Sequence, residues 1–390
     1  MKYKHIYFLL IIFNLFSNII SFNRSYFYRA SSFGGEPRFE RDWLSTINTQ
    51  ITGGSTNFSK NKCYKRRNLF NLYGPDKINL DAPINKFYFT GAFDIFEVNL
   101  NIYQNFKKNI FIHLHVPAVS AQLFPEKIKF PNNPIDINNG FICNKLNQFT
   151  KSLADNNIFL RSVKERGFAD TSFFVGYTIN YEDTNYLDYI DCTIELGALF
   201  ATSKKKDPNL AFSIPLGYNG HYGITWIFNL SIGAYDWVTF GIYNDGVGFF
   251  DITACRPIRT IESETGLIRI NNSVAKIKMG PVYRTGAYIK ADHACWGLSI
   301  LTGFSFEQQN KTTVDLFDIN FSNTRANRDD SLQSWNRWNL NILVDYDFAK
   351  CNRLLNPFIA IIYNYSITGK RIFNTNMIGG YFGLNTEWTF

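Results

Sequence analysis

The chain has 390 residues, a formal net charge of +8 and an aromatic content of 17 % that is spread along its whole length. So many aromatic residues exclude an intrinsically disordered chain, because disordered segments are poor in the side chains that build a core. The basic residues form only short, separate runs, such as 59–67 and 203–206, and we therefore expect no binding of nucleic acid.

Residues 1–22 have the pattern of a cleaved secretory signal peptide. Two lysines precede an apolar run over residues 6–16, and Ser21 is a small residue next to the expected cleavage site. A membrane anchor is the alternative, but this run is shorter than the ~20 apolar residues that a spanning helix needs. We expect the remaining residues, 23–390, to form a single exported domain.

Alternating segments then recur to the end of the chain. Each holds about ten residues in which apolar and polar side chains alternate. Because successive side chains of a strand point to opposite faces, each segment presents one apolar and one polar face. The twelve segments are 42–52, 90–106, 109–119, 172–182, 188–200, 222–235, one that begins at Trp237, 282–291, 295–307, 335–348, 356–366 and 379–390. The alternation is poor in 356–366.

Short and long connections alternate between these segments. The long ones are expected at 53–89, 120–171, 201–221, 245–281, 308–334 and 367–376. If both termini lie on the side of the short turns, every long loop falls on the opposite side, which is typical of outer-membrane barrels. A soluble β-sandwich also alternates. Its exposed face is normally rich in Lys, Glu and Thr, whereas the polar face here is mostly Asn, Ser, Thr and Gly.

The last segment contains GGYFGLNTEWTF and ends on an aromatic residue. Together with the signal peptide and the twelve segments, it resembles Gram-negative outer-membrane β-barrel proteins of the porin-like class. The resemblance implies an all-β chain that forms a closed antiparallel transmembrane barrel of about 12 strands, with short periplasmic turns and long outer loops. It also implies a bacterial outer-membrane location, contact with outer-membrane lipid, and recognition of the last strand by the barrel assembly machinery. The residues that match the assembly signal are Phe382, Leu384, Trp388 and Phe390.

The polar face of the segments supplies the expected lining of the barrel lumen. Opposite charges across a narrow lumen would create a field that selects polar solutes. The alternative is that these charges pair with one another and stiffen a closed lumen, and the sequence leaves both open. The candidate lining residues are Glu97, Asn99, Asn101, His113, His115, Asp191, Glu195, Asn229, Arg284, Lys290, Asp345 and Glu387.

His113 and His115 share one face of a segment, and two histidines can contribute to a metal site. The sequence offers no third ligand, so we expect neither a metal nor another cofactor. The same two residues argue against a lipolytic enzyme. Outer-membrane phospholipases carry their catalytic His and Ser on the lipid-facing side, whereas these histidines face the lumen. We therefore expect no enzymatic activity.

The long connection 120–171 contains Leu146, Phe149 and Leu153 at helical spacing within 144–157. We hypothesise that this helix either constricts the lumen or packs on the outer rim of the barrel.

The six cysteines include no pair at the spacing of zinc or thioredoxin-like sites. An exported chain can form disulfides. Cys295 opens the ninth segment and Cys351 follows the tenth, and adjacent antiparallel strands bring these two ends together on the periplasmic side. We predict a disulfide between them.

Twelve strands enclose a narrower lumen than the 16–18 strands of a general porin. We therefore expect a narrow passive channel for small polar solutes or ions. One alternative is a non-conducting barrel whose long outer loops bind a partner or a host surface, and another is a secreted soluble β-protein. The sequence does not determine the transported solute, the ion selectivity or the oligomeric state.

Overall fold

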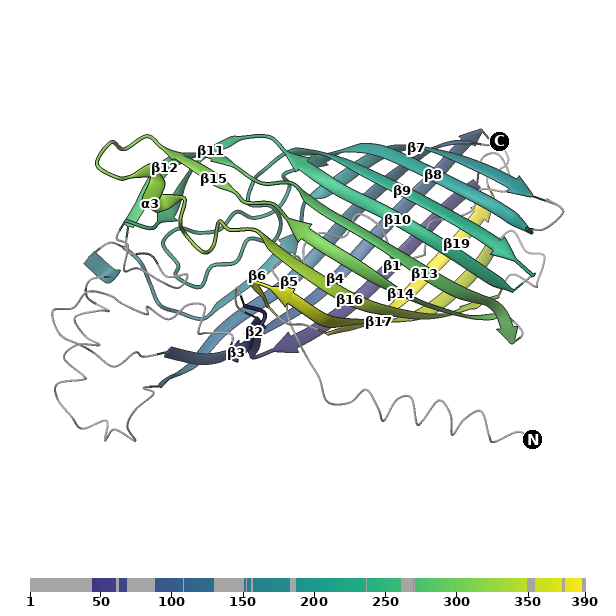
Figure 1. Cartoon of the computed structure of the whole chain (residues 1–390), viewed down its shortest axis with the longest axis horizontal. Coiled ribbons are helices and arrows are strands. Elements are labelled where there is room, and N and C mark those ends of the chain that lie inside the picture. The colour runs from purple at the N-terminus through teal and green to yellow at the C-terminus, as the bar shows by residue number, and fades with distance from the viewer. Residues whose placement is uncertain are drawn as a thin grey trace.

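Twelve strands form a closed antiparallel barrel in the part of the chain that the computed structural model describes (Figure 1). The described residues are 44–60, 63–68, 88–107, 109–129, 151, 153–155, 157–182, 187–235, 237–260, 269, 271–295, 297–348, 355–373 and 376–387. The barrel strands are β1 (Leu44–Thr56), β4 (Tyr88–Lys107), β5 (Ile110–Lys129), β7 (Thr171–Glu182), β8 (Tyr189–Phe200), β9 (Gly223–Ala234), β10 (Val238–Phe249), β13 (Val282–Cys295), β14 (Leu298–Gln309), β16 (Trp335–Asp347), β17 (Leu355–Lys370) and β19 (Met377–Glu387). Each pairs with the next, and β19 pairs with β1, so the predicted barrel is confirmed.

The outer face of the barrel is apolar. On β8, Ile194 and Leu196 are 52 % and 62 % exposed, whereas Thr193 and Glu195 on the other face are buried. Further exposed apolar positions on the barrel strands are Ile47, Ile51, Phe96, Val175, Ile224, Phe240, Ile242, Ile289, Ile300, Phe304, Ile359, Ile361, Ile378 and Phe382. Apolar surface of this extent is unfavourable in water and is covered by lipid in a membrane barrel.

Exposed aromatic residues lie near both ends of the barrel strands. Tyr181, Trp237 and Tyr346 lie near the end with short turns, and Phe200 and Trp338 lie near the other end. Membrane barrels carry aromatic girdles of this kind at the two membrane interfaces. The apolar belt between the two groups is therefore the membrane-spanning part of the barrel.

The two ends of the barrel differ in the length of their connections. At the end where Leu44 pairs with Glu387, the strands are joined by short turns at 108–109, 183–188, 235–237, 296–297 and 348–354. At the other end the connections are 57–87, 130–170, 201–222, 250–281, 310–334 and 371–376. The predicted division into a short-turn end and a long-loop end is confirmed, although the last connection is shorter than expected.

The long connections carry further strands at the outer end of the barrel (Figure 1). One three-stranded sheet contains β11 (Ile252–Ile258), β12 (Asn271–Lys278) and β15 (Thr313–Leu316), and α3 (Asn323–Ala326) packs against it. We call this sheet and α3 the outer domain. A second sheet contains β2 (Phe58–Lys60), β3 (Arg66–Asn68) and β18 (Ile372–Phe373), and β6 (Val163–Phe168) pairs with the outer part of β5.

β4 and β5 run further than the sequence predicted. Each has 20 residues, and β5 continues to Lys129 although the predicted segment ended at residue 119. Near the outer end, Phe93 of β4 lies opposite Leu123 of β5, and both side chains are buried inside the barrel. The apolar residues change from the outer to the inner face at this level, which breaks the alternation on which the prediction depended.

The poor alternation of 356–366 also has a structural reason. On β17, Ala360 and Ile362 face inward and belong to a buried apolar cluster inside the barrel, whereas Ile359 and Ile361 face outward. Both faces of this strand are therefore apolar. A bulge next to Trp338 then shifts the register between β16 and β17.

None of the helices among the described residues has the length and apolar character needed to cross a membrane. Of the helix expected over 144–157, residues 151, 153–155 and 157 are described; 151 and 153–155 are helical with Leu153 buried, and 157 lies in a turn. Phe159, which follows, forms a bridge with Leu210 of the 201–222 connection. The expected signal peptide, 1–22, lies outside the described residues.

Candidate functional site

Eleven of the twelve predicted lining residues have described side chains, and these lie on strand positions that face into the barrel. Eight of them are buried there: Glu97, Asn99, Asn101, His113, His115, Glu195, Asn229 and Arg284. Asp191, Lys290 and Asp345 are partly buried. Glu387 pairs with Leu44 through the backbone, and its side chain lies outside the described part. Contact of these residues with a passing solute stays a prediction.

Four charged residues form a row on the inner face of neighbouring strands. Asp245 of β10, Arg284 of β13, Glu307 of β14 and Arg337 of β16 lie opposite one another in register, so that acid and base alternate. We call this row the charge ladder. Because each guanidinium lies beside a carboxylate, the ladder carries no net charge, and its members are buried without being left unpaired.

The ladder is held together by short ion pairs. Arg284 Nε donates to Asp245 Oδ2 at 3.0 Å, and Arg337 Nη2 donates to Glu307 Oε2 at 2.8 Å. The Arg284 guanidinium also lies 5.3 Å from the centre of the Tyr243 ring, a cation–π contact. The acids and bases are therefore brought together along one wall, not placed on opposite sides of the lumen.

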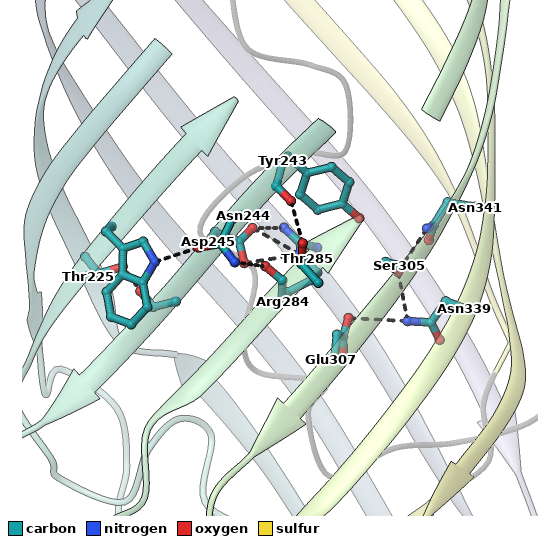
Figure 2. A network of polar contacts seen from close by, with 12 residues as sticks. Thr225, Tyr243, Asn244, Asp245, Arg284, Thr285, Ser305, Glu307, Asn339 and Asn341 are labelled. Atoms are coloured by element: carbon teal, nitrogen blue, oxygen red, sulfur yellow. Dashed lines mark hydrogen bonds and ion pairs between the residues drawn. The ribbon is translucent and has the colours of Figure 1, made fainter. Parts of the chain in front are cut away.

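Amide and hydroxyl groups continue this network (Figure 2). Asn339 Nδ2 and Asn341 Nδ2 both donate to Ser305 Oγ, at 3.2 and 3.0 Å, and Asn339 also reaches Glu307. Figure 2 shows Ser305 between the two asparagines, with Arg284 and Asp245 on the neighbouring strands. The wall from β10 to β16 is a connected polar surface.

Three of the four ladder residues were not among the predicted lining residues. Glu307 and Arg337 occupy inward positions at the outer ends of their segments, and Asp245 was placed in a loop because its segment was left open-ended. The strand parity that identified Arg284 would have identified them as well. Strand length was the missing information for Asp245 alone, since Glu307 and Arg337 lay within predicted segments and were not selected.

The opposite wall, on β4, β5, β7 and β8, is built around His113. Its ring stacks between Tyr103 and Phe174, with centroid distances of 4.0 and 5.0 Å. His113 Nδ1 lies 2.8 Å from Glu195 Oε2, and His113 Nε2 lies 3.2 Å from Asn101 Oδ1. The same Asn101 oxygen lies 2.7 Å from Nδ1 of His115. We call Asn101, His113, His115 and Glu195 the histidine cluster.

A third polar group lies toward the short-turn end. Lys290 Nζ is 2.8 Å from Asp292 Oδ1 and 3.7 Å from Asp345 Oδ2. Thr239 Oγ1 donates to Asp292 Oδ2 at 2.5 Å and lies the same distance from the Tyr189 hydroxyl. Lys290 and Asp345 were both predicted to line the lumen, and the structure brings them together.

Two inner amides on β1 and β4 differ from those on the ladder wall. Asn48 and Asn99 are almost wholly buried, and within the described residues neither amide forms a hydrogen bond. A buried polar group without a partner costs about 1–3 kcal/mol. The two walls therefore differ in how their inner amides are held, because Asn339 and Asn341 form hydrogen bonds with other described residues.

The 201–222 connection folds inward at the outer end of the barrel. Its second half contains a run of buried residues, among them Phe212, Leu216 and Tyr218. Tyr218 belongs to an apolar cluster with inward-facing residues of six barrel strands, which are Phe174, Leu199, Ile227, Val247, Val282 and Trp335. We call residues 201–222 the mouth loop, because it packs against the inner wall at the outer mouth.

Asp170, just before β7, holds the mouth loop at two points. Its Oδ1 accepts the N–H of Ser203 at 3.0 Å, and its Oδ2 accepts the N–H of Tyr218 at 2.5 Å. A single buried carboxylate thus joins the beginning and the end of the loop. The predicted constriction was limited to 120–171, and the mouth loop was missed although its apolar run LAFSIPLG is unusual for an exposed connection.

The outer domain contains a further buried ion pair. Arg269 donates from Nε and Nη2 to the two carboxylate oxygens of Asp329, both at 2.8 Å. Burial by itself would raise the pKa of Asp329, but the Arg269 guanidinium and the N–H of Ser331 hold this pKa below its ordinary value. The pair lies beside an apolar cluster that joins the sheet to α3.

The remaining predicted sites are only partly within the described residues. Phe382 is exposed on the outer face of β19 and Leu384 is half-buried, whereas Trp388 and Phe390 lie outside the described part. Their role as an assembly signal stays a prediction. The predicted disulfide also stays one, because Cys351 and the side chain of Cys295 lie outside the described part. Among the described residues, no three His, Cys, Asp or Glu side chains form a group that could hold a metal ion.

No protein-family model matches the chain, and no curated protein matches it in sequence. Solved structures do match. An outer membrane channel from Pseudomonas putida F1 has a TM-score of 0.53 and 8 % sequence identity, with 91 % of this chain and 100 % of that chain covered. The chain has the fold of a bacterial outer-membrane β-barrel. The predicted fold class is thereby confirmed.

Two further matches are weaker. A FadL homologue from Pseudomonas aeruginosa has a TM-score of 0.32 and 9 % identity, with 95 % of this chain and 99 % of that chain covered. The Pseudomonas putida toluene transporter TodX has a TM-score of 0.29 and 10 % identity, with 95 % of this chain and 96 % of that chain covered.

The location of the barrel follows from its own features. A closed barrel leaves no unpaired edge in lipid, and its apolar belt, aromatic girdles and unequal ends are those of the bacterial outer membrane.

Proposed function

We propose that the chain is an outer-membrane channel that passively admits small polar solutes or ions. The charge ladder carries this proposal, because it places four ionic side chains on the inner face of a barrel whose outer face is apolar. A barrel that served only as an anchor would gain nothing from ionic groups in its interior, since buried ion pairs contribute little to stability in comparison with apolar packing.

The chemistry of the ladder favours polar solutes. A solute that passes along β10 to β16 can exchange hydrogen bonds with guanidinium, carboxylate and amide groups, as polar solutes do in lined pores. An apolar solute would have to displace these contacts without replacing them. Twelve strands enclose a narrow interior, so the solutes would be small.

The mouth loop supports a narrow outer entrance. Tyr218 packs against the inner wall, so the side chains of this loop would form one boundary of the path. We propose that solutes pass between the mouth loop and the ladder wall. The proposal includes no enzymatic step. Besides the solute, it names outer-membrane lipid around the apolar belt and the barrel assembly machinery at the last strand as partners.

The test is conductance of the refolded chain in a planar lipid bilayer. We expect discrete current steps, and we expect Glu307→Gln to lower the preference for cations because it leaves Arg337 without its carboxylate. Folding is checked independently by the heat-dependent shift of the barrel on an SDS gel. A barrel that shows this shift but carries no current would refute the channel function while leaving the fold intact.

A second candidate is a non-conducting barrel whose outer loops bind a partner. Two observations favour it: the inner charges are paired with one another, and the outer domain exposes Phe317 and Ile319, which are 62 % and 97 % exposed. The same bilayer experiment separates the two candidates. Absence of current from a folded barrel, with retention of a ligand by the outer domain, would favour this second function.

A further inference from the structure

The histidine cluster connects two barrel strands that are not neighbours. His113 lies on β5 and Glu195 on β8, with β7 between them. β7 and β8 each present a glycine near this crossing. A Cβ atom at Gly176 would lie 2.1 Å from the Phe111 ring, and one at Gly197 would lie 2.7 Å from the Phe174 ring. Phe174, one of the two rings that stack on His113, and the Phe111 ring on β5 therefore lie directly over bare backbone.

This crossing reinforces a short seam of the barrel. β5 pairs with β7 only from Ile110 to His115, and its outer part pairs with β6 instead. The contact between His113 and Glu195 is completely buried. A buried ion pair between these two strands would hold β7 in place from the inner side.

The hydrogen-bond distances show which protons the cluster can share. Asn101 Oδ1 is a carbonyl oxygen, which can only accept, and it lies within bonding distance of His113 Nε2 and His115 Nδ1. In this orientation of the amide, both nitrogens would donate to it. His113 Nδ1 faces a carboxylate oxygen of Glu195, and one proton between these two atoms completes the contact. A His113 ring with a proton on each nitrogen would therefore make all of these hydrogen bonds at once.

We propose that the histidine cluster is a buried proton-binding site. When His113 loses its Nε2 proton, that nitrogen becomes an acceptor. The Asn101 amide must then rotate and present its NH₂ group, which donates to His113 and to His115 in place of the carbonyl. His115 must in turn accept at Nδ1 and hold its proton on Nε2. One proton thus sets the charge of the Glu195 pair, the orientation of one amide and the tautomer of a second histidine.

The surroundings contain few other ionisable groups. From β4, Tyr103 stacks on the His113 ring and Glu97 lies further along the same inner face. β5 contributes His115, and β8 contributes Asp191 beyond Glu195. The inner side chain of β7 at this level is Phe174, which does not ionise. Within the described part of the chain, neither an arginine nor a lysine forms an ion pair with Glu195, and His113 is its basic partner in this cluster.

The first experiment measures the temperature at which the detergent-folded barrel loses its compact mobility on an SDS gel, at values from pH 5 to pH 8. Imidazole changes its charge within this range. The ion pair exists only while His113 is charged, so we expect the midpoint to be higher at the acid end, by a few degrees on the order expected for one interaction. Glu195→Gln keeps the shape and should abolish this dependence.

A matched control is Glu307→Gln, which also removes a buried carboxylate. Its partner Arg337 stays charged at every pH in the range, so the midpoint should fall equally throughout. Asn101→Asp provides a test in the opposite direction. Its carboxylate can only accept, so it should retain both histidine protons and move the transition toward higher pH.

Nitrogen NMR of the chain labelled at histidine reads the proton directly. We expect one ring, absent in His113→Gln, with both nitrogens protonated at acid pH, and a change at His115 as that proton leaves. An unchanged pH dependence in Glu195→Gln would overturn the proposal, as would a His113 ring that stays neutral from pH 5 to pH 8. Neither readout needs a conducting channel, so this inference and the proposed function can fail separately.

Discussion

The two inner walls of the barrel both bury carboxylates, but they pair these carboxylates with different bases. On the ladder wall, each buried carboxylate faces an arginine, whose charge is permanent. On the histidine wall, the buried Glu195 faces an imidazole, whose charge depends on pH. Both walls bury acids inside a membrane barrel. If the histidine cluster binds a proton as proposed, the choice of base decides whether an inner wall keeps a fixed charge or changes its charge with pH.

Removal of one arginine from the charge ladder should lower the stability of the barrel more than any other change considered below. Arg284→Met would leave Asp245 buried without its guanidinium, and removal of one partner from a buried ion pair costs about 3–5 kcal/mol. We expect a correspondingly lower midpoint in urea unfolding of the detergent-folded barrel. The double variant with Asp245→Leu should recover most of the loss. A double variant as unstable as the single one would show that the pair is not what makes Arg284 important.

Loss of the contacts that hold the mouth loop should have the second-largest effect on stability. Asp170→Ala removes the acceptor of two backbone N–H groups, at a cost of about 1–3 kcal/mol. We expect a larger single-channel conductance, because the mouth loop no longer bounds the path. Glu165→Ala is the control, since its lysine partner on the same loop, Lys204, is exposed and such pairs contribute about 0–1 kcal/mol. Equal conductance in both variants would place the loop outside the path.

Two matched asparagine substitutions compare how much an inner amide contributes to stability on the ladder wall and on β4. Asn339→Leu removes hydrogen bonds to Ser305 and Glu307 and should destabilise the barrel by about 1 kcal/mol or more. Asn99→Leu has nearly the same shape but removes an amide that forms no hydrogen bond with the described residues. We expect it to leave the unfolding midpoint unchanged or to raise it. A large loss from Asn99→Leu would reveal a contact that the buried amide does make.

The smallest effect concerns the outer domain, which lies outside the membrane. The depressed pKa of Asp329 means that its contribution to stability is fully present above the ordinary aspartate value and is lost as the pH falls through the lower, folded value. Below about pH 4 we expect faster proteolysis of the outer connections, with the barrel itself intact on a gel. Asp329→Asn should be sensitive already at pH 7. Asp315→Asn, which removes an exposed pair with Lys278, should change little.

Strand parity predicted most of the residues that face inward, but not which of them form ion pairs and hydrogen bonds with one another. Alternation on β8 and β9 is regular because one face of each strand meets lipid and the other does not, and that constraint acts locally. It failed on β17 and on the outer part of β5, where apolar residues also face inward. The ladder residue Asp245 was overlooked because it lies near a strand end, where the sequence does not show how far pairing continues. Glu307 and Arg337 lay within predicted segments but were not chosen as lining residues, and it is the register of the strands that brings them together.

Local alternation and connection length were enough to predict the number of barrel strands, their order, the inward and outward faces of the regularly alternating strands, and the end that carries the long loops. Which inner residues meet depends on the folded barrel. The charge ladder depends on the register of four strands, and the contact between His113 and Glu195 joins two strands that have a third between them. The attachment of the mouth loop depends on a carboxylate far away in the chain. Register, closure and loop folding are set by the whole barrel at once, and no local pattern records them.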